Sequence, residues 1–380
     1  MKASAKVLQR VMIIAGETSG DVHGAGVVRE LKRRQPSIEI FGIGGDMMQR
    51  EGMTLTYHVR ELSFMGFWEV VKHLPLIRSV ERTMEQLLKL KKPDVVLLID
   101  YPGFNLRFAR VIKSYGIKIA YYISPQVWAW KKGRIKTMKD VVDKMLVVFS
   151  FEADLYKKEN IPVEFVGHPL LEELNVEWSR EQFCKRYGID SRKKILALIP
   201  GSRQQEIANI FSVMARAAKE LKDSFALEVV VAVAPHLSLD AYREYVPEGC
   251  DIHFVEGATH DVMKFSDAAV VTSGTATLET ACFGTPMIVV YRTSWITYLI
   301  GRAVVRIKNI SLANIVAGKS VVPELIQHRA TVQRIVSLAS KLLNDENVRA
   351  TMRSELLAVK EKLGSAGAST RVAEAIFAMS

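Results

Sequence analysis

Three neighbouring residues, Ser273, Gly274 and Thr275, could bind an anion, and a carboxylate, Glu279, follows them by about one helical turn. The apolar run before them predicts a strand and the residues after them a short helix. Their backbone N–H groups would then lie at a helix N-terminus, where anions bind. The carboxylate could accept hydrogen bonds from a vicinal diol such as a ribose. Phosphate and sugar recognition side by side indicate a nucleotide-sugar, although a strand–helix–strand unit capped by hydroxyls gives the same pattern without a ligand.

A second turn with anion-binding character consists of Gly201, Ser202 and Arg203, between a predicted strand and a predicted helix. Arginine offers a planar fork of donors that matches an oxyanion, so this turn indicates phosphate binding. A capped helix with a surface arginine is the alternative. The sequence contains no Gly-x-Ser-x-Gly elbow and no His-Glu-x-x-His pair, so it does not support a serine hydrolase or a zincin.

The glycine-bounded loop 16–24 concentrates groups that could hold or activate a substrate. We predict substrate contacts from Gly16, Glu17, Ser19, Gly20 and Asp21, and a possible catalytic role for His23. A helix cap would account for one serine or aspartate in such a loop, but not for a glutamate and a histidine as well. The glycines that follow do not form a dinucleotide fingerprint, because Arg29 stands where the third glycine is required.

Asp100 directly follows the apolar run 95–99, which predicts a buried strand of a parallel sheet. Ligands bind beyond the carboxyl ends of such strands, so we expect Asp100 to face the substrate. Partial burial would raise its pKa and let it accept a hydroxyl proton as a general base, with His23 as the reserve candidate. An aspartate that only forms a turn is the alternative.

Two segments have the composition of lipid-binding surfaces. The segment 62–77 is apolar over most of its helical circumference, and its candidate acyl or membrane contacts are Phe64, Met65, Phe67, Trp68, Val71 and Leu74. A core helix gives the same pattern, whereas a groove for acyl chains or a membrane contact is the functional interpretation. Trp128 and Trp130 are followed by a run of cations, which suits an anionic lipid interface or stacked nucleic acid. The apolar segment upstream favours a membrane over RNA.

Strand-like apolar runs alternate with helical patterns along almost the whole chain, which indicates parallel α/β architecture. The strand–loop–helix pattern opens twice, at Val11 and at Lys194, so we predict two Rossmann-like doubly wound domains facing an interdomain cleft. The N-terminal domain, which carries the apolar segment 62–77, is expected to span residues 1–175 and to be completed by the C-terminal helix 365–380. The second domain, which carries the turns at Gly201 and Ser273 and would bind the nucleotide-sugar, is expected to span residues 176–364.

The composition is that of a folded protein with an acidic partner. The chain has 380 residues, 49% of them hydrophobic, and a formal net charge of +11. This charge suits a phosphorylated substrate, a nucleic acid or an anionic membrane. No apolar run reaches the roughly 18 residues of a membrane-spanning helix, and the N-terminal apolar run is too short for a signal peptide, so a cytoplasmic location is expected. Cys184, Cys250 and Cys282 are widely spaced, which predicts neither a disulfide framework nor a cysteine-based metal site.

Seven motifs, taken in order, resemble the lipid-A-disaccharide synthase family of GT-B glycosyltransferases. They lie at residues 16–24, 99–105, 124–130, 166–170, 200–203, 272–279 and 314–318 and extend over nearly the whole chain. Each motif is weak by itself, but seven in this order are specific.

The resemblance implies an inverting transfer of 2,3-diacylglucosamine from UDP to 2,3-diacylglucosamine 1-phosphate. The product is the β-1,6-linked lipid A disaccharide of lipopolysaccharide, and UDP is released. The resemblance also implies no metal and no cofactor, a peripheral position on the inner face of the inner membrane of a Gram-negative-type bacterium, and homodimers that exchange C-terminal parts. We expect no nucleic acid partner.

This reaction gives each candidate residue a role. Asp100 is expected to be the base for the acceptor hydroxyl, Arg203 and the turn at Ser273 to hold the diphosphate, and Glu279 to hold the ribose. The donor pocket is expected to be completed by Thr277, Asn314 and Gln327. Two alternatives stay open: another UDP-sugar enzyme of the same fold, such as a 2-epimerase or a peptidoglycan transferase, and a non-enzymatic basic membrane- or RNA-binding protein.

Overall fold

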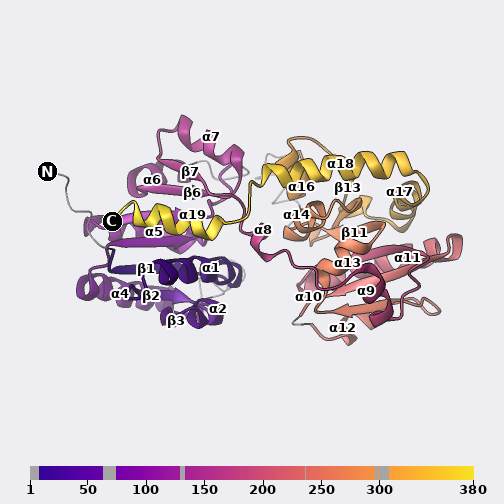
Figure 1. The fold of residues 1–380 in the computed structure, drawn as a ribbon, viewed down its shortest axis with the longest axis horizontal. Coiled ribbons are helices and arrows are strands. Elements are labelled where there is room, and N and C mark those ends of the chain that lie inside the picture. The colour runs from indigo at the N-terminus through magenta and orange to yellow at the C-terminus, as the bar shows by residue number, and fades with distance from the viewer. Residues whose placement is uncertain (1–7, 63–73, 129–132, 236, 296–297, 299–307) are drawn as a thin grey trace. The chain divides into compact units, whose positions relative to one another are not determined.

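The computed structural model describes residues 8–62, 74–128, 133–235, 237–295, 298 and 308–380. The chain forms two compact units, Met1–Glu172 with Gly364–Ser380 and Glu173–Leu363 (Figure 1). Each unit is built on its own parallel sheet, which confirms the prediction of two Rossmann-like α/β domains. The sequence analysis placed the boundaries between the two domains after residue 175 and before residue 365.

The first unit contains a seven-stranded parallel sheet in the order β3-β2-β1-β4-β5-β6-β7. Its strands are β1 (Arg10–Ala15), β2 (Glu39–Gly44), β3 (Thr54–His58), β4 (Val95–Ile99), β5 (Lys118–Tyr122), β6 (Lys144–Val147) and β7 (Val163–Phe165). All five residues of β4 are buried, as expected for a central parallel strand that is covered on both faces. The strand order reverses between β1 and β4, so the loops after these two strands, which carry Glu17 and Asp100, lie next to each other.

Helices cover this sheet, and one of them comes from the far end of the chain. They are α1 (Thr18–Arg34), α2 (Asp46–Arg50), η1 (Val59–Glu61), α4 (Leu74–Lys91), α5 (Pro102–Ser114), α6 (Arg134–Val141), α7 (Ser150–Lys158), α8 (Leu170–Glu173) and α19 (Ala368–Phe377). Helix α19, in yellow in Figure 1, packs against α1. Ser369 reaches the carboxylate of Glu172 through its backbone N–H (2.9 Å) and its hydroxyl (2.7 Å), which ties α19 to the first unit.

The second unit contains a six-stranded parallel sheet in the order β10-β9-β8-β11-β12-β13. Its strands are β8 (Lys194–Ile199), β9 (Leu227–Val233), β10 (His253–Glu256), β11 (Ala268–Thr272), β12 (Met287–Tyr291) and β13 (Glu324–Ile326). The order reverses between β8 and β11, which brings together the loops that begin at Gly201 and at Ser273.

The helices of the second unit follow the same alternating plan. They are α9 (Arg180–Tyr187), α10 (Gln204–Glu206), η2 (Ile207–Phe211), α11 (Ser212–Ser224), α12 (Asp240–Arg243), α13 (Thr259–Phe265), α14 (Thr275–Cys282), α16 (Leu312–Ala317), η3 (Gln327–Arg329), α17 (Val332–Asn344) and α18 (Glu346–Lys362). The predicted strand, turn, short helix and strand around Ser273 are confirmed as β11, α14 and β12.

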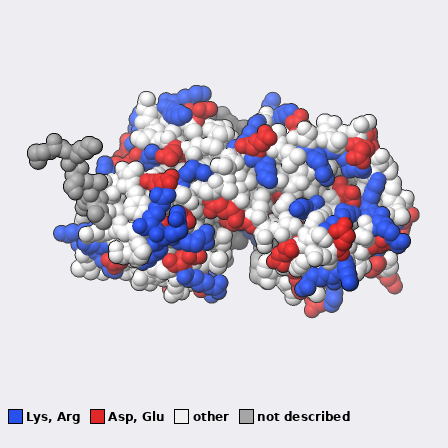
Figure 2. All heavy atoms as spheres, in the orientation of Figure 1, with Lys and Arg blue, Asp and Glu red and all other residues white. Residues whose placement is uncertain are grey.

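Charges of both signs share the surface. Figure 2 shows Lys and Arg side chains interspersed with Asp and Glu on both units. Ion pairs engage several of these cations, among them Arg29 with Glu51 (3.4 Å) and Arg34 with Glu374 (2.5 Å). Within the described residues, no helix combines the length and the apolarity that are needed to cross a membrane.

Candidate functional site

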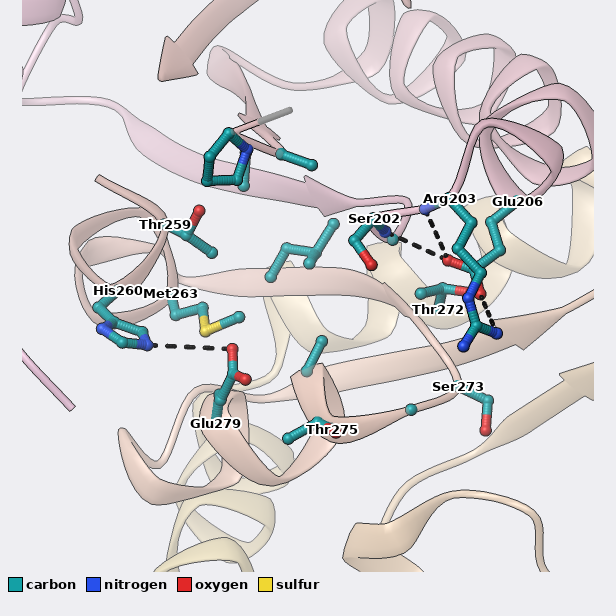
Figure 3. Close-up of a pocket in the computed structure, with 17 residues that line it drawn as sticks. Ser202, Arg203, Glu206, Thr259, His260, Met263, Thr272, Ser273, Thr275 and Glu279 are labelled. Carbon is teal, nitrogen blue, oxygen red and sulfur yellow. Dashed lines mark hydrogen bonds and ion pairs between the residues drawn. The ribbon is translucent and has the colours of Figure 1, made fainter. Parts of the chain in front are cut away.

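A pocket of about 440 Å³ opens at the carboxyl ends of β8, β9 and β11 in the second unit (Figure 3). Seven of the residues predicted to bind substrate line it: Gly201, Ser202, Arg203, Ser273, Gly274, Thr275 and Glu279. The structure therefore brings together the two turns that the sequence could only name separately. The lining also includes Glu206, Thr259, His260, Met263 and Thr272, which the sequence analysis missed.

The turn at Ser273 places the N-terminus of α14 at the pocket. Gly274 has a φ of 155° and directly precedes the first residue of the helix, Thr275. The first N–H groups of a helix have no intrahelical acceptor and carry the positive end of its dipole. The Ser273 hydroxyl itself donates to the carbonyl of Ile310 (3.2 Å), so the backbone of the turn, more than this hydroxyl, is available to an anion.

Thr277, which the sequence analysis placed in the donor pocket, is not among the residues that line this pocket. Its side chain is fully buried, and its hydroxyl donates to the Gly274 carbonyl at 2.8 Å. Thr277 therefore stabilises the turn through its hydrogen bond to the Gly274 carbonyl. Thr272, which precedes the turn, also lines the pocket, and its buried Oγ1 has no hydrogen-bond partner within the described residues. A buried polar atom left in this state is unusual in a folded protein.

The second turn already holds a carboxylate of the same chain. Oε2 of Glu206 accepts hydrogen bonds from the backbone N–H groups of Ser202 (3.2 Å) and Arg203 (3.3 Å), as Figure 3 shows. Gly201 has a φ of 105°, and a Cβ there would lie 2.2 Å from this oxygen, so the turn requires glycine. The guanidinium of Arg203 lies 3.7 Å from Oε1 of Glu206 and is 64% exposed, which leaves it able to reach a bound anion.

Glu279 faces the pocket from α14, and its Oε2 lies 4.0 Å from Nε2 of His260 (Figure 3). Burial and the neighbouring carboxylate of Glu173 raise the pKa of Glu279 to about 7. A carboxylate in this position can accept hydrogen bonds from two adjacent hydroxyls. His260 follows β10, and the rule that ligands bind beyond strand ends was the signal that could have found it.

In the first unit, Asp100 is held in a tight turn at the end of β4. Asp100 and Tyr101 have φ values of 44° and 45°, in the left-handed region. The carbonyl of Asp100 accepts hydrogen bonds from Asn105 Nδ2 (2.8 Å) and from the Tyr121 hydroxyl (2.5 Å). These contacts fix the backbone that carries the carboxylate.

The structure brings the three titratable candidates of the first unit together. Burial, and then the nearby Glu17 carboxylate, raise the pKa of Asp100 to about 6, while His23 and Arg134 act in the opposite direction. At neutral pH such a carboxylate is ionised but basic enough to accept a proton. Glu17 is exposed, as is Ser19 beside it.

Close packing explains why glycines stand at two positions of the first loop. A Cβ on Gly16 would lie 2.1 Å from the ring of Tyr101, so this glycine lets the loop pass close to the Asp100 turn. Gly20 is buried in α1, where a Cβ would lie 3.2 Å from the side chain of Ala15.

Asp21, predicted to contact the substrate, has its carboxylate engaged within the chain. Its carboxylate is 3% exposed and accepts hydrogen bonds from the backbone N–H groups of Gly45 (2.7 Å), Met47 (3.0 Å) and Met48 (3.0 Å). Asp21 therefore holds the start of α2 against α1, and its oxygens are occupied by the chain itself.

Asn314 and Gln327, predicted to complete the donor pocket, are not among the residues that line it. Asn314 Oδ1 accepts from the N–H groups of Val321 (2.7 Å) and Val322 (3.0 Å), and its Nδ2 donates to Glu324 (2.8 Å) and to the Val322 carbonyl (2.9 Å). Gln327 exchanges two hydrogen bonds with the backbone of Thr293, at 2.8 and 2.9 Å. Both side chains are buried, and these hydrogen bonds stabilise loops of the second unit.

Most of the predicted lipid contacts lie outside the described residues: Phe64, Met65, Phe67, Trp68, Val71 and Trp130. Helix α4 begins at Leu74, and its side chain is likewise not described. The ends of the segment, Leu62 and Ile77, are buried in the core of the first unit.

Trp128 is half-buried in the first unit, which the prediction of a surface contact did not anticipate. Its indole N–H donates to Glu152 Oε1 (3.1 Å), and its ring meets Phe151 edge-on at 5.5 Å. Burial raises the pKa of Glu152 to about 8. Contacts with Glu152 and Phe151 thus hold Trp128 in place, although the residue stays partly accessible to solvent.

Known proteins match this chain along its length. A sequence model described as "Lipid-A-disaccharide synthetase" matches residues 11–376. The lipid-A-disaccharide synthase of Geobacter sulfurreducens is 41% identical over 372 residues, which are 97% of each chain. The enzyme of the same name from Syntrophus aciditrophicus is 42% identical over 368 residues, which are 96% of each chain.

Solved structures share the fold at low sequence identity. A UDP-GlcNAc 2-epimerase from Neisseria meningitidis, bound to UDP-GlcNAc, has a TM-score of 0.65 at 14% identity and covers 97% of this chain and 100% of its own. A calicheamicin glycosyltransferase has a TM-score of 0.65 at 13% identity and covers 98% of both chains. These likenesses show the two-domain GT-B architecture.

Proposed function

Since the chain belongs to the lipid-A-disaccharide synthase family, we propose roles for its residues in the reaction of that family. The chain is a glycosyltransferase of lipid A biosynthesis that forms the lipid A disaccharide. This membership disfavours the 2-epimerase, the peptidoglycan transferase and the non-enzymatic binding protein that the sequence left open. The donor and acceptor that follow from the family resemblance are UDP-2,3-diacylglucosamine and 2,3-diacylglucosamine 1-phosphate.

The pocket of the second unit is proposed to hold the UDP part of the donor. The N-terminus of α14 and the exposed guanidinium of Arg203 supply positive potential for a diphosphate. Glu279 lies one helical turn further along α14, at a distance suited to the ribose of the same nucleotide. The observation that carries this proposal is that both turns, Glu279 and Thr272 line one pocket.

The acceptor is proposed to react beside Asp100. An α-linked donor and a β-linked product require one inverting displacement at the anomeric carbon. The 6-hydroxyl oxygen of the acceptor forms a bond to that carbon, its proton passes to the Asp100 carboxylate, and the bond to the diphosphate breaks so that UDP leaves with the electron pair. Arg203 and the α14 N-terminus stabilise the charge that develops on UDP. His23, which influences Asp100 electrostatically, is the reserve base.

Substitution of Asp100 by Asn tests this assignment. The variant keeps the shape of the side chain but cannot accept the proton, so we expect turnover to fall by about 10²–10⁴ while UDP binding is retained. The assay is mass-spectrometric detection of the disaccharide formed from the two diacylated sugars, together with calorimetric titration of UDP.

Asp223→Asn is the matched control, because Asp223 is an exposed aspartate near the end of α11. Turnover of Asp100→Asn close to that of this control would show that another group is the base. A full loss of UDP binding in Asp100→Asn would instead indicate a general loss of structure.

The chain is further proposed to act as a peripheral protein on the inner face of the bacterial inner membrane. The diacylated substrates, the positive net charge and the apolar segment 62–77 support this position. A homodimer that exchanges C-terminal parts is proposed as well, because α19 returns from the second unit to pack on α1, and the same contact can form between two copies of the chain. Sedimentation velocity of the full chain decides between monomer and dimer.

A further inference from the structure

His260 lies on α13 with a defined neighbour at each ring nitrogen. Nδ1 accepts a hydrogen bond from the backbone N–H of Asn175 at 3.2 Å. Nε2 lies on the other side of the ring, 4.0 Å from Oε2 of Glu279, and Figure 3 shows the two side chains pointing toward one another. The ring also packs against Phe283, with 5.8 Å between ring centres. The imidazole is thus held between a backbone amide and a pocket carboxylate.

The Asn175 contact determines which nitrogen carries the proton. Because the Asn175 N–H donates to Nδ1, that nitrogen presents a lone pair, and the proton of the neutral ring lies on Nε2. The N–H of Nε2 is then directed at Glu279. A separation of 4.0 Å is longer than a hydrogen bond, but a small rotation of either side chain closes it, and such contacts commonly tighten when a substrate binds.

The segment on the other side of His260 is the one by which the chain enters the second unit. Glu173 is the first residue of that unit. Just beyond it, the N–H groups of Glu177 and Trp178 donate to the carboxylate of Asp261 at 3.4 and 3.2 Å. Asp261 is 1% exposed and is the next residue of α13 after His260. Two adjacent side chains of α13 therefore hold the entering segment, and one of them also reaches the pocket.

We infer that His260 is a positioning residue of the donor site, which orients the Glu279 carboxylate toward the ribose diol while its Nδ1 is fixed by the entering segment. This inference rests on the proposed role of Glu279. A carboxylate that receives the His260 N–H on one oxygen keeps lone pairs in a fixed direction for the 2′- and 3′-hydroxyls. Without that donor the carboxylate can rotate, and the two sugar contacts are no longer preorganised.

Two near-isosteric variants separate the two sides of the ring. In His260→Asn the amide oxygen takes the place of Nδ1 and can still accept from Asn175, but nothing reaches Glu279. In His260→Gln the terminal N–H₂ group takes the place of Nε2 and can still donate to Glu279, while the acceptor for Asn175 is lost. If His260 only held the entering segment, His260→Gln would impair UDP recognition more than His260→Asn.

The readout is the preference for UDP over 2′-deoxy-UDP, measured by isothermal titration of the full chain. The wild type should bind UDP more tightly, because Glu279 accepts from the 2′-hydroxyl. His260→Asn should lose about tenfold to 150-fold of that preference, the range for one hydrogen bond to a charged group. His260→Gln should keep most of it. Hydrogen exchange at the Asn175 amide should show the opposite order, with faster exchange in His260→Gln.

Different failures have different meanings. If His260→Asn keeps the wild-type preference, the inference is wrong and the proposed donor site is unaffected. If the wild type binds UDP and 2′-deoxy-UDP equally, or if Glu279→Ala, which removes both carboxylate oxygens, keeps the preference, the ribose role of Glu279 is wrong and the inference falls with it. If His260→Gln loses as much preference as His260→Asn, a donor at the position of Nε2 is not what orients Glu279, which also overturns the inference.

Discussion

Asp100 stands in a backbone conformation that residues with a side chain rarely adopt, and its neighbour Tyr101 shares it. Each left-handed residue costs about 1–2 kcal/mol, so the surrounding structure must hold the turn. Asn105 and Tyr121, which both donate to the Asp100 carbonyl, do so from α5 and β5. Strain maintained at the end of a central strand commonly positions a functional group. The geometry therefore supports Asp100 as a reacting residue independently of its pKa.

The raised pKa of Asp100 predicts the acid side of the pH profile. The ionised carboxylate is the active form of a base, and its pKa is about 6. Activity should therefore be lost as pH falls through 6, with kcat/KM decreasing about tenfold per unit below it. Disaccharide formation measured from pH 5 to 8.5 gives this profile.

Glu17→Gln tests whether the Glu17 carboxylate raises the pKa of Asp100. It removes a neighbouring negative charge that raises the pKa of Asp100, so the acid side of the profile should move to lower pH. An unchanged profile in this variant would mean that the titrating group is not Asp100.

At the scale of the element, the contact between α1 and α19 depends on one glycine. A Cβ on Gly26 would lie 2.3 Å from the hydroxyl of Ser369, which is itself hydrogen-bonded to Glu172. A side chain at position 26 would therefore displace Ser369 from its present contact. This contact gives the first unit its C-terminal element and sets the chain path that returns from the second unit.

Gly26→Ala should loosen α19, because the added methyl group breaks the contact between Ser369 and Glu172. We expect a loss of about 1–3 kcal/mol in the stability of the first unit, measured by thermal unfolding, and faster tryptic cleavage within residues 368–377. Gly103→Ala in α5 is the control, since a Cβ there meets nothing within 4 Å. Equal cleavage rates in the two variants would show that the packing of α19 tolerates a side chain at position 26.

At the scale of the whole molecule, the two units are proposed to divide the reaction between nucleotide and acceptor. In this proposal the pocket at the β8 and β11 ends binds the donor, and the Asp100 cluster at the β1 and β4 ends binds the acceptor. Both sites lie at a switch point of strand order, where loops from neighbouring strands separate and leave room for a ligand. The apolar segment 62–77 belongs to the acceptor unit, as a diacylated acceptor requires.

Membrane association should therefore depend on the large side chains of that segment. Phe67→Ser and Trp68→Ser should each weaken binding to anionic lipid vesicles about tenfold, because each removes a large side chain that is proposed to enter the bilayer surface. Cosedimentation with phosphatidylglycerol vesicles measures this change. Leu357→Ser, which alters an exposed leucine on α18 of the other unit, is the control. If both variants cosediment as well as that control, the segment has no membrane role.

The sequence by itself determined the architecture and the position of the donor turn. Alternation of apolar strand runs with helical patterns is a local property, so two parallel sheets could be predicted without any contact between distant residues. Glycines at positions such as Gly201 mark turns that other residues cannot form. Such turns, at the ends of strands, were therefore visible in the order of residue types.

Only the tertiary structure decided what each polar side chain does. Asp21 and Asn314 have the residue types of ligands, yet their oxygens accept from backbone N–H groups of Gly45 and Val321, which the fold brings to them. The position of His260 after a strand could be seen in the sequence, but its 4.0 Å separation from Glu279 on another helix could not. Hydrogen bonds are short and directional, so a few ångströms of chain placement separate a group that holds the fold from one that meets the substrate.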